Sequence, residues 1–350
     1  MLFGKKKINI VGLDIGSRTL KVAEVVQSNT GYTLKKFGMN DITPGLIEDG
    51  AIKNPEEVAN AIRKLFKMYK VKEKNVAVSI GGYSIIVKPI TVQTMPEDQL
   101  QETIHFEAEQ YIPFDISDVN LDFQIMGEDE ADPGQMNVLL VAAKKEVVDD
   151  YVRLINMAGL TPKIIDVDAF ALQNIYEANY ETDDNVALID IGANKTTLNI
   201  LRGDYSVLIR DVTLGCSQIS QQITSQIGGS MEEAEQLYHS GESDQIAQKD
   251  LIEIVSSIVT DWCSEVRRAL DFFYTTYHGE HIKKIILSGG GANIAQFRQL
   301  LAEETSSDVQ MINPFENFLL GGTFDPAYLE RVSPQAAICM GLALRRLNDK

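Results

Sequence analysis

The chain has 350 residues, 44% of them hydrophobic, which is enough to build the cores of two domains. It carries 32 Lys and Arg against 50 Asp and Glu, a formal net charge of −18, which argues against a broad polyanion-binding face and against nucleic acid as a partner. Its three cysteines, Cys216, Cys263 and Cys339, lie far apart and form no CxxC pair, which indicates neither a zinc site nor a disulfide framework and fits a reducing cytoplasm.

Leu2 and Phe3 lie near the start of the sequence, three lysines follow at Lys5–Lys7, and a strand-like segment comes directly afterwards. No apolar stretch there resembles a signal peptide, and no apolar run elsewhere is long enough to cross a bilayer. We therefore expect a soluble chain with a solvated start. Weak contact between the lysines and an anionic membrane is the alternative.

One short sequence motif, the repeated phrase, occurs twice in the chain. An acidic residue, an isoleucine and a glycine end an apolar run at Asp14–Gly16 and again at Asp190–Gly192. Two further strand-like segments follow each copy, and they span 22–26 and 32–37 after the first copy and 198–201 and 205–210 after the second. This repeated order of strand, loop, strand, turn and strand predicts two similar half-molecules that face each other.

The sequence between the two copies contains more strands and helices than one half-molecule of this kind requires. Pro55 opens a helix, a strand 76–80 follows it, and Gly81-Gly82 breaks that strand. Residues 82–161 then read as a separate small α+β unit, an insertion whose ends lie close together. Its expected elements are strands 84–92, 120–126 and 136–142, helices 97–111 and 145–158, and an acidic loop 127–134.

After the insertion, a strand 162–167 and the segment 168–176 resume the first domain. The elements expected in the rest of the chain are helices 216–227, 231–240 and 250–277, a strand 283–287 and a final helix 334–347. We therefore expect a first domain of residues 1–81, 162–185 and 326–350. The second domain is expected to span 186–325 and to include the helical part.

Each repeated phrase has the chemistry of a phosphate-binding turn. A glycine just past a strand lets the backbone turn sharply and present N–H groups to an anion. Alone, either copy indicates only a tight turn, but two copies in matching context favour a shared triphosphate, with Asp14 and Asp190 holding the hydration shell of Mg²⁺. The polar donors beside them are Ser17, Arg18 and Lys21 in the first copy, and Asn194 and Thr196 in the second.

Two further features fit a nucleotide but have an ordinary structural explanation. The turn Ser288–Gly291 joins a strand to a helix, so its N–H groups could approach a nucleotide or simply form the turn. Glu265 and Arg268 flank the apolar stripe of the long helix, where they are free to face a cleft. They would hydrogen-bond a ribose and stack on a base; the alternative is a solvated i, i+3 ion pair.

The order of these segments resembles that of the actin-like ATPase superfamily. That resemblance implies an α/β fold of two domains, a duplicated ribonuclease H-like fold. The segments that carry the resemblance are 14–21, 168–176, 190–197, 288–291 and 334–347. The inserted α+β unit is similar to that of the FtsA-type bacterial actins, and the phrases 44–52 and 107–114 narrow the resemblance to the PilM family of type IV pilus assembly proteins.

The resemblance also implies roles for individual residues. ATP phosphates and Mg²⁺ would contact the two turns, and adenosine the long helix and the glycine loop. The residues so assigned are Asp14, Gly16, Ser17, Arg18, Lys21, Asp190, Gly192, Asn194, Thr196 and Gly215 for phosphate and metal, and Glu265, Arg268, Gly289, Gly290 and Gly291 for adenosine. Asp168 would position the attacking water, as a catalytic residue. It is shorter than the glutamate often found there, and Cys216 stands where a second glycine is common, so at most slow ATPase activity is expected.

The function implied is that of a cytoplasmic, ATP-binding platform on the inner face of the bacterial inner membrane, within the machine for type IV pili and twitching motility. By the resemblance, the cytoplasmic N-terminal tail of the membrane protein PilN would bind in a groove between the first domain and the inserted unit. The chain would thereby link the alignment complex of PilN and PilO to the pilus motor ATPases. A homo-oligomeric ring and membrane association through partners are further implications.

Two other functions remain open. One is a filament-forming cell-division ATPase like FtsA, although such chains usually carry a linker and an amphipathic helix after the last connecting helix, and here Asn-Asp-Lys follows Leu347. The other is a small-molecule kinase of the same superfamily. A kinase needs a catalytic aspartate facing the terminal phosphate, and the inserted unit shows no acid in an evident loop motif for that role.

The remaining candidates have weaker signals. His278 and His281 have the spacing of a metal half-site, but a surface pair is the favoured interpretation because no third ligand converges on them. Glu107 and Glu109 lie two apart on a helix and so point to different faces. The stretch 111–114, Tyr-Ile-Pro-Phe, indicates either a helix stop with an aromatic plug or a surface that contacts a partner.

Overall fold

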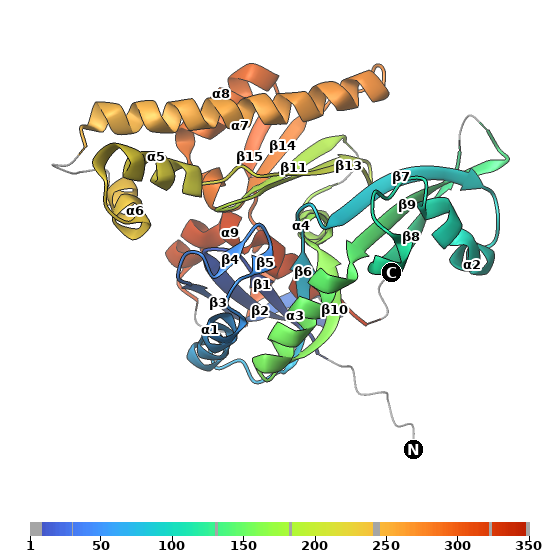
Figure 1. Ribbon diagram of the computed structural model, residues 1–350, viewed down its shortest axis with the longest axis horizontal. Helices are drawn as coiled ribbons and strands as arrows, with labels where there is room; N and C mark the ends of the chain where they lie inside the picture. Colours follow the sequence, from blue (N-terminus) through green and yellow to red (C-terminus); the bar gives the residue numbers. More distant parts are fainter. Residues whose placement is uncertain are drawn as a thin grey trace.

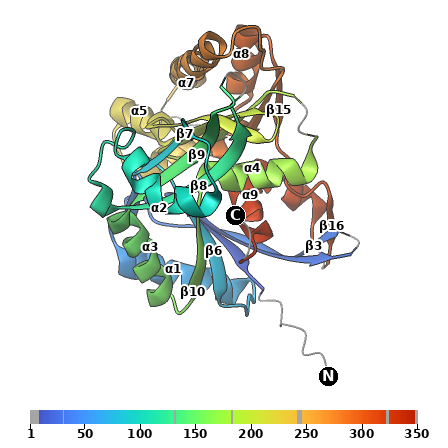
Figure 2. The same cartoon turned by 90° about the vertical axis from the view of Figure 1, so that its right-hand side faces the viewer.

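The computed structural model describes residues 9–29, 31–129, 132–181, 184–240, 246–321 and 324–347. Two mixed sheets face each other across two helices, α4 (Asp168–Asn179) and α9 (Pro326–Leu344), as Figures 1 and 2 show from two sides. Side chains of both sheets and of both helices form one continuous apolar core. None of the described helices is long and apolar enough to cross a membrane.

The first sheet is mixed: its strands pair in parallel on one side of β1 (Val11–Ile15), and on the other side two antiparallel pairings are followed by a parallel edge strand. Every residue of β1 is buried, Asp14 included, and all its other side chains are apolar or glycine. The strand order is β10 (Thr161–Val167), β6 (Asn75–Ile80), β1 (Val11–Ile15), β2 (Thr19–Ser28), β3 (Gly31–Asp41) and β16 (Phe318–Leu320).

The second sheet repeats this plan, with order β13 (Tyr205–Val212), β12 (Thr196–Arg202), β11 (Val186–Ile191), β14 (Lys284–Ser288) and β15 (Asp308–Met311). The two turns that follow β1 and β11 are built alike. The Gly16 N–H donates to the Thr19 carbonyl at 3.1 Å, and the Gly192 N–H donates to the Lys195 carbonyl at 2.9 Å. The predicted repeat of strand, turn and strand is therefore confirmed at the level of single hydrogen bonds.

Helices α4 and α9 cross in close contact between the sheets. A Cβ on Gly341 of α9 would lie 1.7 Å from the Ala171 carbonyl oxygen of α4, so only glycine fits there. The expected final helix, 334–347, differs from the observed one, which begins at Pro326 and ends at Leu344. Asp325 caps its first turn, and Pro334 lies within the helix, where its carbonyl accepts a hydrogen bond from the Gly289 N–H at 2.9 Å.

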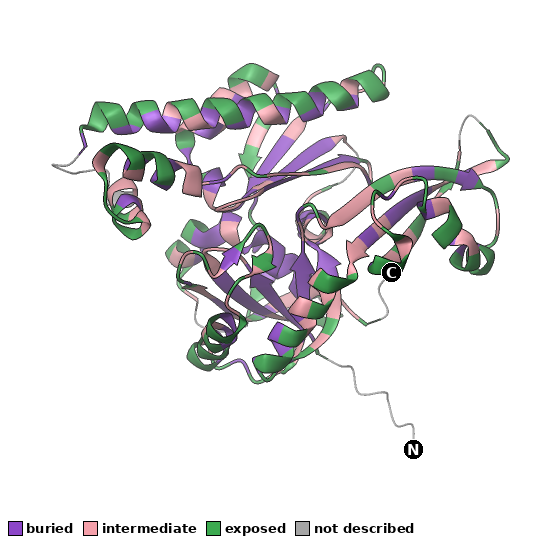
Figure 3. Cartoon of the chain, in the orientation of Figure 1, coloured by how far each residue is buried: buried purple, intermediate pink, exposed green. Residues whose placement is uncertain are grey.

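The outer face of each sheet is covered by further helices (Figure 1). On the second sheet, α5 (Ser217–Ile227), α7 (Gln248–Thr276) and α8 (Ala295–Thr305) share one core, in which Trp262 and Phe297 meet edge to face. The inner side of α7 is buried and its outer side is exposed (Figure 3). Helix α6 (Met231–Ser240) packs beside α5.

The inserted unit is a three-stranded antiparallel sheet in the order β7 (Ile85–Gln93), β9 (Gln135–Lys144) and β8 (Val119–Glu128). One face of α2 (Glu97–Ala108) packs against this sheet. The acidic loop joins β8 to β9, and its residues 130–131 lie outside the described part of the chain.

Two segments pack across the boundaries expected for the domains. Helix α3 (Lys145–Met157), placed in the inserted unit by its position in the sequence, shares the core of the first sheet with α1 (Pro55–Met68). Strand β16, within the range expected for the second domain, pairs with β3 in the first sheet. Short hydrogen-bonded pieces such as β16 and the hairpin β4 (Ile47–Glu48) and β5 (Ala51–Ile52) carry no apolar periodicity, so the sequence did not predict them. The division into domains otherwise stays a proposal.

Candidate functional site

A cleft of about 1220 Å³ lies between the two half-molecules, and both repeated turns open into it. The predicted residues that line it are Asp14, Gly16, Ser17, Arg18, Lys21, Asp168, Asp190, Gly192, Asn194, Gly289 and Gly290. Eleven candidates from four separate stretches of sequence are thus brought to one place.

The first carboxylate of the cleft is held by a lysine. Asp14 and Lys21 face each other across β1 and β2, and the Lys21 Nζ donates to the Asp14 Oδ2 at 2.8 Å. Both residues are buried. Burial works to lower the pKa of Lys21, but the negative charges of Asp14 and Asp190 hold that pKa above its ordinary value, so the ammonium stays charged.

The second carboxylate has a different environment. Asp190 lies opposite Thr197, which has no charge, and the Ser288 hydroxyl of β14 donates to the Asp190 Oδ1 at 2.7 Å. Burial raises the pKa of Asp190 to about 6, and this effect outweighs the hydrogen bond from Ser288. The two acids of the repeated phrase therefore have different partners, a lysine at Asp14 and a serine at Asp190.

Asp168 stands at the start of α4, on the floor of the cleft. The Ser79 hydroxyl donates to it at 2.5 Å and the Lys195 Nζ at 2.6 Å. Burial works to raise the pKa of Asp168, but the charge of Lys195 and these hydrogen bonds hold that pKa below its ordinary value. In this arrangement Asp168 is a firmly ionised partner of a lysine, which makes it a weak general base.

Three predicted residues support the turns from behind instead of lining the cleft. The Thr196 hydroxyl donates to the Leu214 carbonyl at 2.9 Å. A Cβ on Gly215 would lie 2.3 Å from a backbone oxygen of the second turn, and a Cβ on Gly291 would lie 2.3 Å from the Ile191 side chain. These residues let β11, α5 and the glycine loop approach one another closely.

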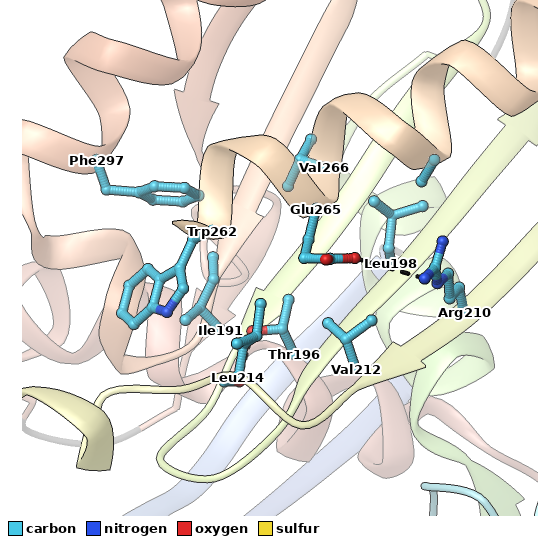
Figure 4. Close-up of a pocket in the computed structure, with 11 residues that line it drawn as sticks. Ile191, Thr196, Leu198, Arg210, Val212, Leu214, Trp262, Glu265, Val266 and Phe297 are labelled. Carbon is cyan, nitrogen blue, oxygen red and sulfur yellow. Dashed lines mark hydrogen bonds and ion pairs between the residues drawn. The ribbon is translucent and has the colours of Figure 1, made fainter. Parts of the chain in front are cut away.

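The structure does not bring Glu265 and Arg268 to the cleft. Glu265 borders a separate cavity of about 10 Å³ between α7 and the second sheet, beside Trp262, which has room for one water molecule at most (Figure 4). Its carboxylate accepts hydrogen bonds from Arg210 of β13, at 3.4 Å, and from Arg268, which is exposed. The pair lies on the flank of α7, as predicted, but that flank faces β13 and solvent.

The sequence predicts that α7 faces the nucleotide cleft, but the structure places α6 there instead. Glu232, Glu235, Gln236 and Tyr238 line the cleft from this helix. Glu235 also forms an ion pair across the cleft with Arg18 of the first turn. One feature of the sequence could have indicated this wall. The predicted helix 231–240 has a polar face and lies nearer in sequence to the second turn than α7 does.

The remaining candidates lie outside the cleft. His278 and His281 are exposed near the end of α7, and no group of three or more metal-ligating side chains occurs among the residues that the structure describes. Glu107 of α2 is partly buried, and Glu109, which follows the last residue of α2, is exposed. Phe114 packs against the core of the inserted unit and also borders a second, smaller groove.

Comparison with known proteins identifies the family. The sequence model described as "Type IV pilus assembly protein PilM" matches residues 12–347, nearly the whole chain. The chain belongs to the PilM family. Its structure superposes on a chain of the solved "PilM-PilN type IV pilus biogenesis complex" with a TM-score of 0.87 and 28% identity, over 98% of this chain and all of that one.

More distant relatives show the wider superfamily. The cell division protein FtsA of Bacillus subtilis (strain 168) is 23% identical over 92% of this chain and 81% of its own length. MreB 5 of Spiroplasma citri, solved with bound AMPPNP, has the same fold with a TM-score of 0.50 and 13% identity, over 88% of this PilM-family chain and 92% of that chain. The predicted actin-like fold and the resemblance to PilM and FtsA are confirmed.

The cleft suits a nucleoside triphosphate with Mg²⁺ in both size and chemistry. Small-molecule sites commonly measure about 300–1000 Å³, so a cleft of about 1220 Å³ has room for such a ligand. Asp14 and Asp190 offer carboxylate oxygens, which Mg²⁺ prefers and often contacts through water. The cationic side chains that line the cleft are Arg18, Lys21, Lys195 and Arg331.

Proposed function

We propose that this chain is a nucleotide-binding platform of the type IV pilus machine, which takes Mg²⁺-ATP in the cleft and the cytoplasmic tail of PilN in a neighbouring groove. The observation that carries the proposal is the facing pair of equivalent turns, each preceded by an aspartate, in a chain of the PilM family. The MreB structure with AMPPNP supports nucleotide binding by this fold. Phosphates would lie between the turns, with hydrated Mg²⁺ near Asp14 and Asp190.

The proposed site binds nucleotide better than it hydrolyses it. A general base must be free to accept a proton from the attacking water, and Asp168 is already engaged by Lys195 and Ser79. Its low pKa weakens it further as a base. Nucleotide binding then serves mainly as a signal, with slow or negligible turnover.

The groove proposed for the tail measures about 270 Å³ and lies where the inserted unit joins the first sheet. Strand β7 forms one side and packs beside β13 (Figure 1). Pro113 and Phe114 also line the groove. Apart from Asp168, Thr197 and Asp211, its lining is apolar, which suits apolar side chains of an extended segment. The solved PilM-PilN complex supports PilN as the partner. A place at the inner face of the inner membrane, beside PilO and the motor ATPases and in a ring, belongs to the same proposal.

Replacing either aspartate of the repeated phrase is expected to weaken Mg²⁺-ATP binding. Asp14→Ala and Asp190→Ala each remove one charge-assisted contact, which is worth about 1–3 kcal/mol. Isothermal titration calorimetry of both variants measures this loss, with exposed Lys249→Met as the matched control. Unchanged affinity in both aspartate variants removes the cleft as the nucleotide site.

Val87→Asp is expected to abolish most binding of the PilN tail. Val87 lines the groove from β7 without belonging to a core cluster, so the new carboxylate meets the bound peptide more than the folded core. Loss of a central apolar contact costs about 2 kcal/mol or more, roughly 30-fold in affinity. Fluorescence anisotropy with a labelled synthetic peptide of the PilN N-terminal tail measures it.

The matched control is Ile252→Asp, which places the same charge at an exposed apolar position on α7, far from the groove. It should bind the tail peptide with unchanged affinity. If Val87→Asp binds the peptide as the control does, the tail lies elsewhere and this part of the proposal is wrong.

The match to FtsA keeps a filament-forming ATPase as the second candidate. High-speed sedimentation of the chain with Mg²⁺-ATP separates the two, since only a filament former pellets in a nucleotide-dependent way. A kinase of the same superfamily would instead phosphorylate an acceptor in a panel of sugars and acetate.

A further inference from the structure

Lys195 is a cleft residue that the sequence motifs left unassigned. It lies in the turn after β11, yet its side chain contacts the other half-molecule. The Lys195 Nζ donates to the Asp168 Oδ2 of α4 at 2.6 Å and lies 3.5 Å from the Asp211 Oδ2 of β13. Burial works to lower the pKa of Lys195, but the two carboxylates raise it well above its ordinary range, so Lys195 stays charged.

The contacts of Lys195 extend from the cleft to the groove. Asp168 lines both of these spaces, and Asp211 lines the groove. Asp211 also accepts the backbone N–H of Gly82, at the first residue of the inserted unit, and the Thr197 hydroxyl at 2.6 Å. One lysine therefore neutralises two carboxylates that stand between the nucleotide cleft and the inserted unit.

The backbone of the first half is shaped around this lysine. A Cβ on Gly81 would lie 2.1 Å from the Lys195 Nζ and 2.5 Å from the Asp168 Oδ2. Because glycine leaves this space open, the ammonium reaches Asp168 at the junction between β6 and β7. Of the other cations at the two turns, Lys21 is held by Asp14 and Arg18 by Glu235.

We propose that Lys195 binds the terminal phosphate of a nucleoside triphosphate and, in moving to it, releases Asp168 and Asp211 and so changes the groove. The proposal rests on the function proposed above and names how that site is regulated. A lysine ammonium is a point charge on a flexible stem and suits this transfer between carboxylate and phosphate. Once it leaves, two like charges border the groove without their shared cation, and the contact from Asp211 to Gly82 weakens.

The first test compares triphosphate with diphosphate. In the wild-type chain, calorimetric titration should give tighter binding of Mg²⁺-ATP than of Mg²⁺-ADP. Lys195→Met should weaken Mg²⁺-ATP about 10–100-fold, the value of a hydrogen bond to a charged group, and change Mg²⁺-ADP by less than about threefold. Lys249→Met, an exposed lysine on α7, is the control and should change neither.

The second test measures the coupling without needing the partner. Hydrogen exchange of the Gly82 amide, followed by mass spectrometry of peptides that cover residues 80–85, should be faster with Mg²⁺-ATP than with Mg²⁺-ADP in the wild type. The difference should vanish in Lys195→Met. Asp211→Asn, which keeps an acceptor for the Gly82 N–H but removes one charge, should reduce it. The PilN tail peptide should likewise show an affinity that depends on nucleotide, within the usual 5- to 150-fold range of allosteric coupling.

The outcomes separate the two proposals. If the wild type binds nucleotide and Lys195→Met loses ATP and ADP equally, or neither, the assignment of Lys195 is overturned while the proposed function stands. The same holds if exchange at Gly82 is identical with ATP and ADP. If the wild type binds no nucleotide at all, both proposals fall together.

Discussion

Asp14→Ala is expected to lower the free energy of unfolding by about 3–5 kcal/mol, because it leaves the buried Lys21 ammonium without its partner. Asp190 also attracts Lys21, so the loss should fall toward the lower end of that range. The effect lies in the first half-molecule, where β1 and β2 form the centre of the sheet. Urea unfolding followed by far-ultraviolet circular dichroism measures it as a lower midpoint of the transition.

The double variant Asp14→Ala with Lys21→Met is the control. Replacing a buried ion pair by apolar groups is often close to neutral, so the double variant should regain most of the lost stability. A double variant as unstable as the single one would show that Asp14 acts through something other than Lys21. A single variant as stable as the wild type would show that the pair is solvated.

The repeated phrase shows how far the sequence could predict the site. It predicted both turns and their shared cleft, because a strand that ends in an acid and a glycine has few ways to continue. It could not show that the aspartates of the two copies have neighbours of different charge. That difference depends on which residue stands opposite the acid in the neighbouring strand: Lys21 opposite Asp14, but Thr197 opposite Asp190.

The placement of α7 shows what the sequence of a single helix can and cannot predict. The apolar stripe correctly predicted which side of α7 is buried, including Trp262 and Phe273. It could not say what the polar flank faces, since that depends on how the helix crosses the sheet. Glu265 meets Arg210 of β13, and the cleft wall comes from α6. Lys195 was missed for a similar reason, because its partner Asp168 is brought near only by the meeting of the two halves.

Two ion pairs join the two halves at the cleft, in addition to hydrogen bonds elsewhere such as that from Ser206 to Gln173. Arg18 pairs with Glu235 at one side, and Lys195 pairs with Asp168 at the other. A ligand with several negative charges would compete for both cations. Binding of such a ligand would therefore be coupled to the relative position of the halves, as the proposed function requires.

Asp190→Asn is expected to stabilise the protein at pH 8 while weakening Mg²⁺-ATP binding. The ordinary pKa of 3.8 for this carboxyl rises to about 6 on folding, so its stabilising contribution is present in full below about pH 4 and is lost as the pH rises through about 6. At pH 8 the folded chain therefore holds a carboxylate in an unfavourable place. Asparagine removes that charge and can still accept the hydrogen bond from Ser288. The gain should be about 1–3 kcal/mol, nearer the lower value because the side chain borders the cleft.

The pH dependence distinguishes this explanation from a general packing effect. The difference in stability between Asp190→Asn and the wild type should be largest above about pH 7 and should shrink toward zero near pH 4, where the wild-type carboxyl is protonated. Thermal unfolding at pH 4, 6 and 8 measures it, and Mg²⁺-ATP titration at pH 8 should show a loss of about 1–3 kcal/mol in the same variant. Stability that rises equally at every pH would contradict the role of the charge. A variant that is stabilised yet binds nucleotide poorly would mean that Asp190 is kept ionised at a cost to folding because the cation site requires it.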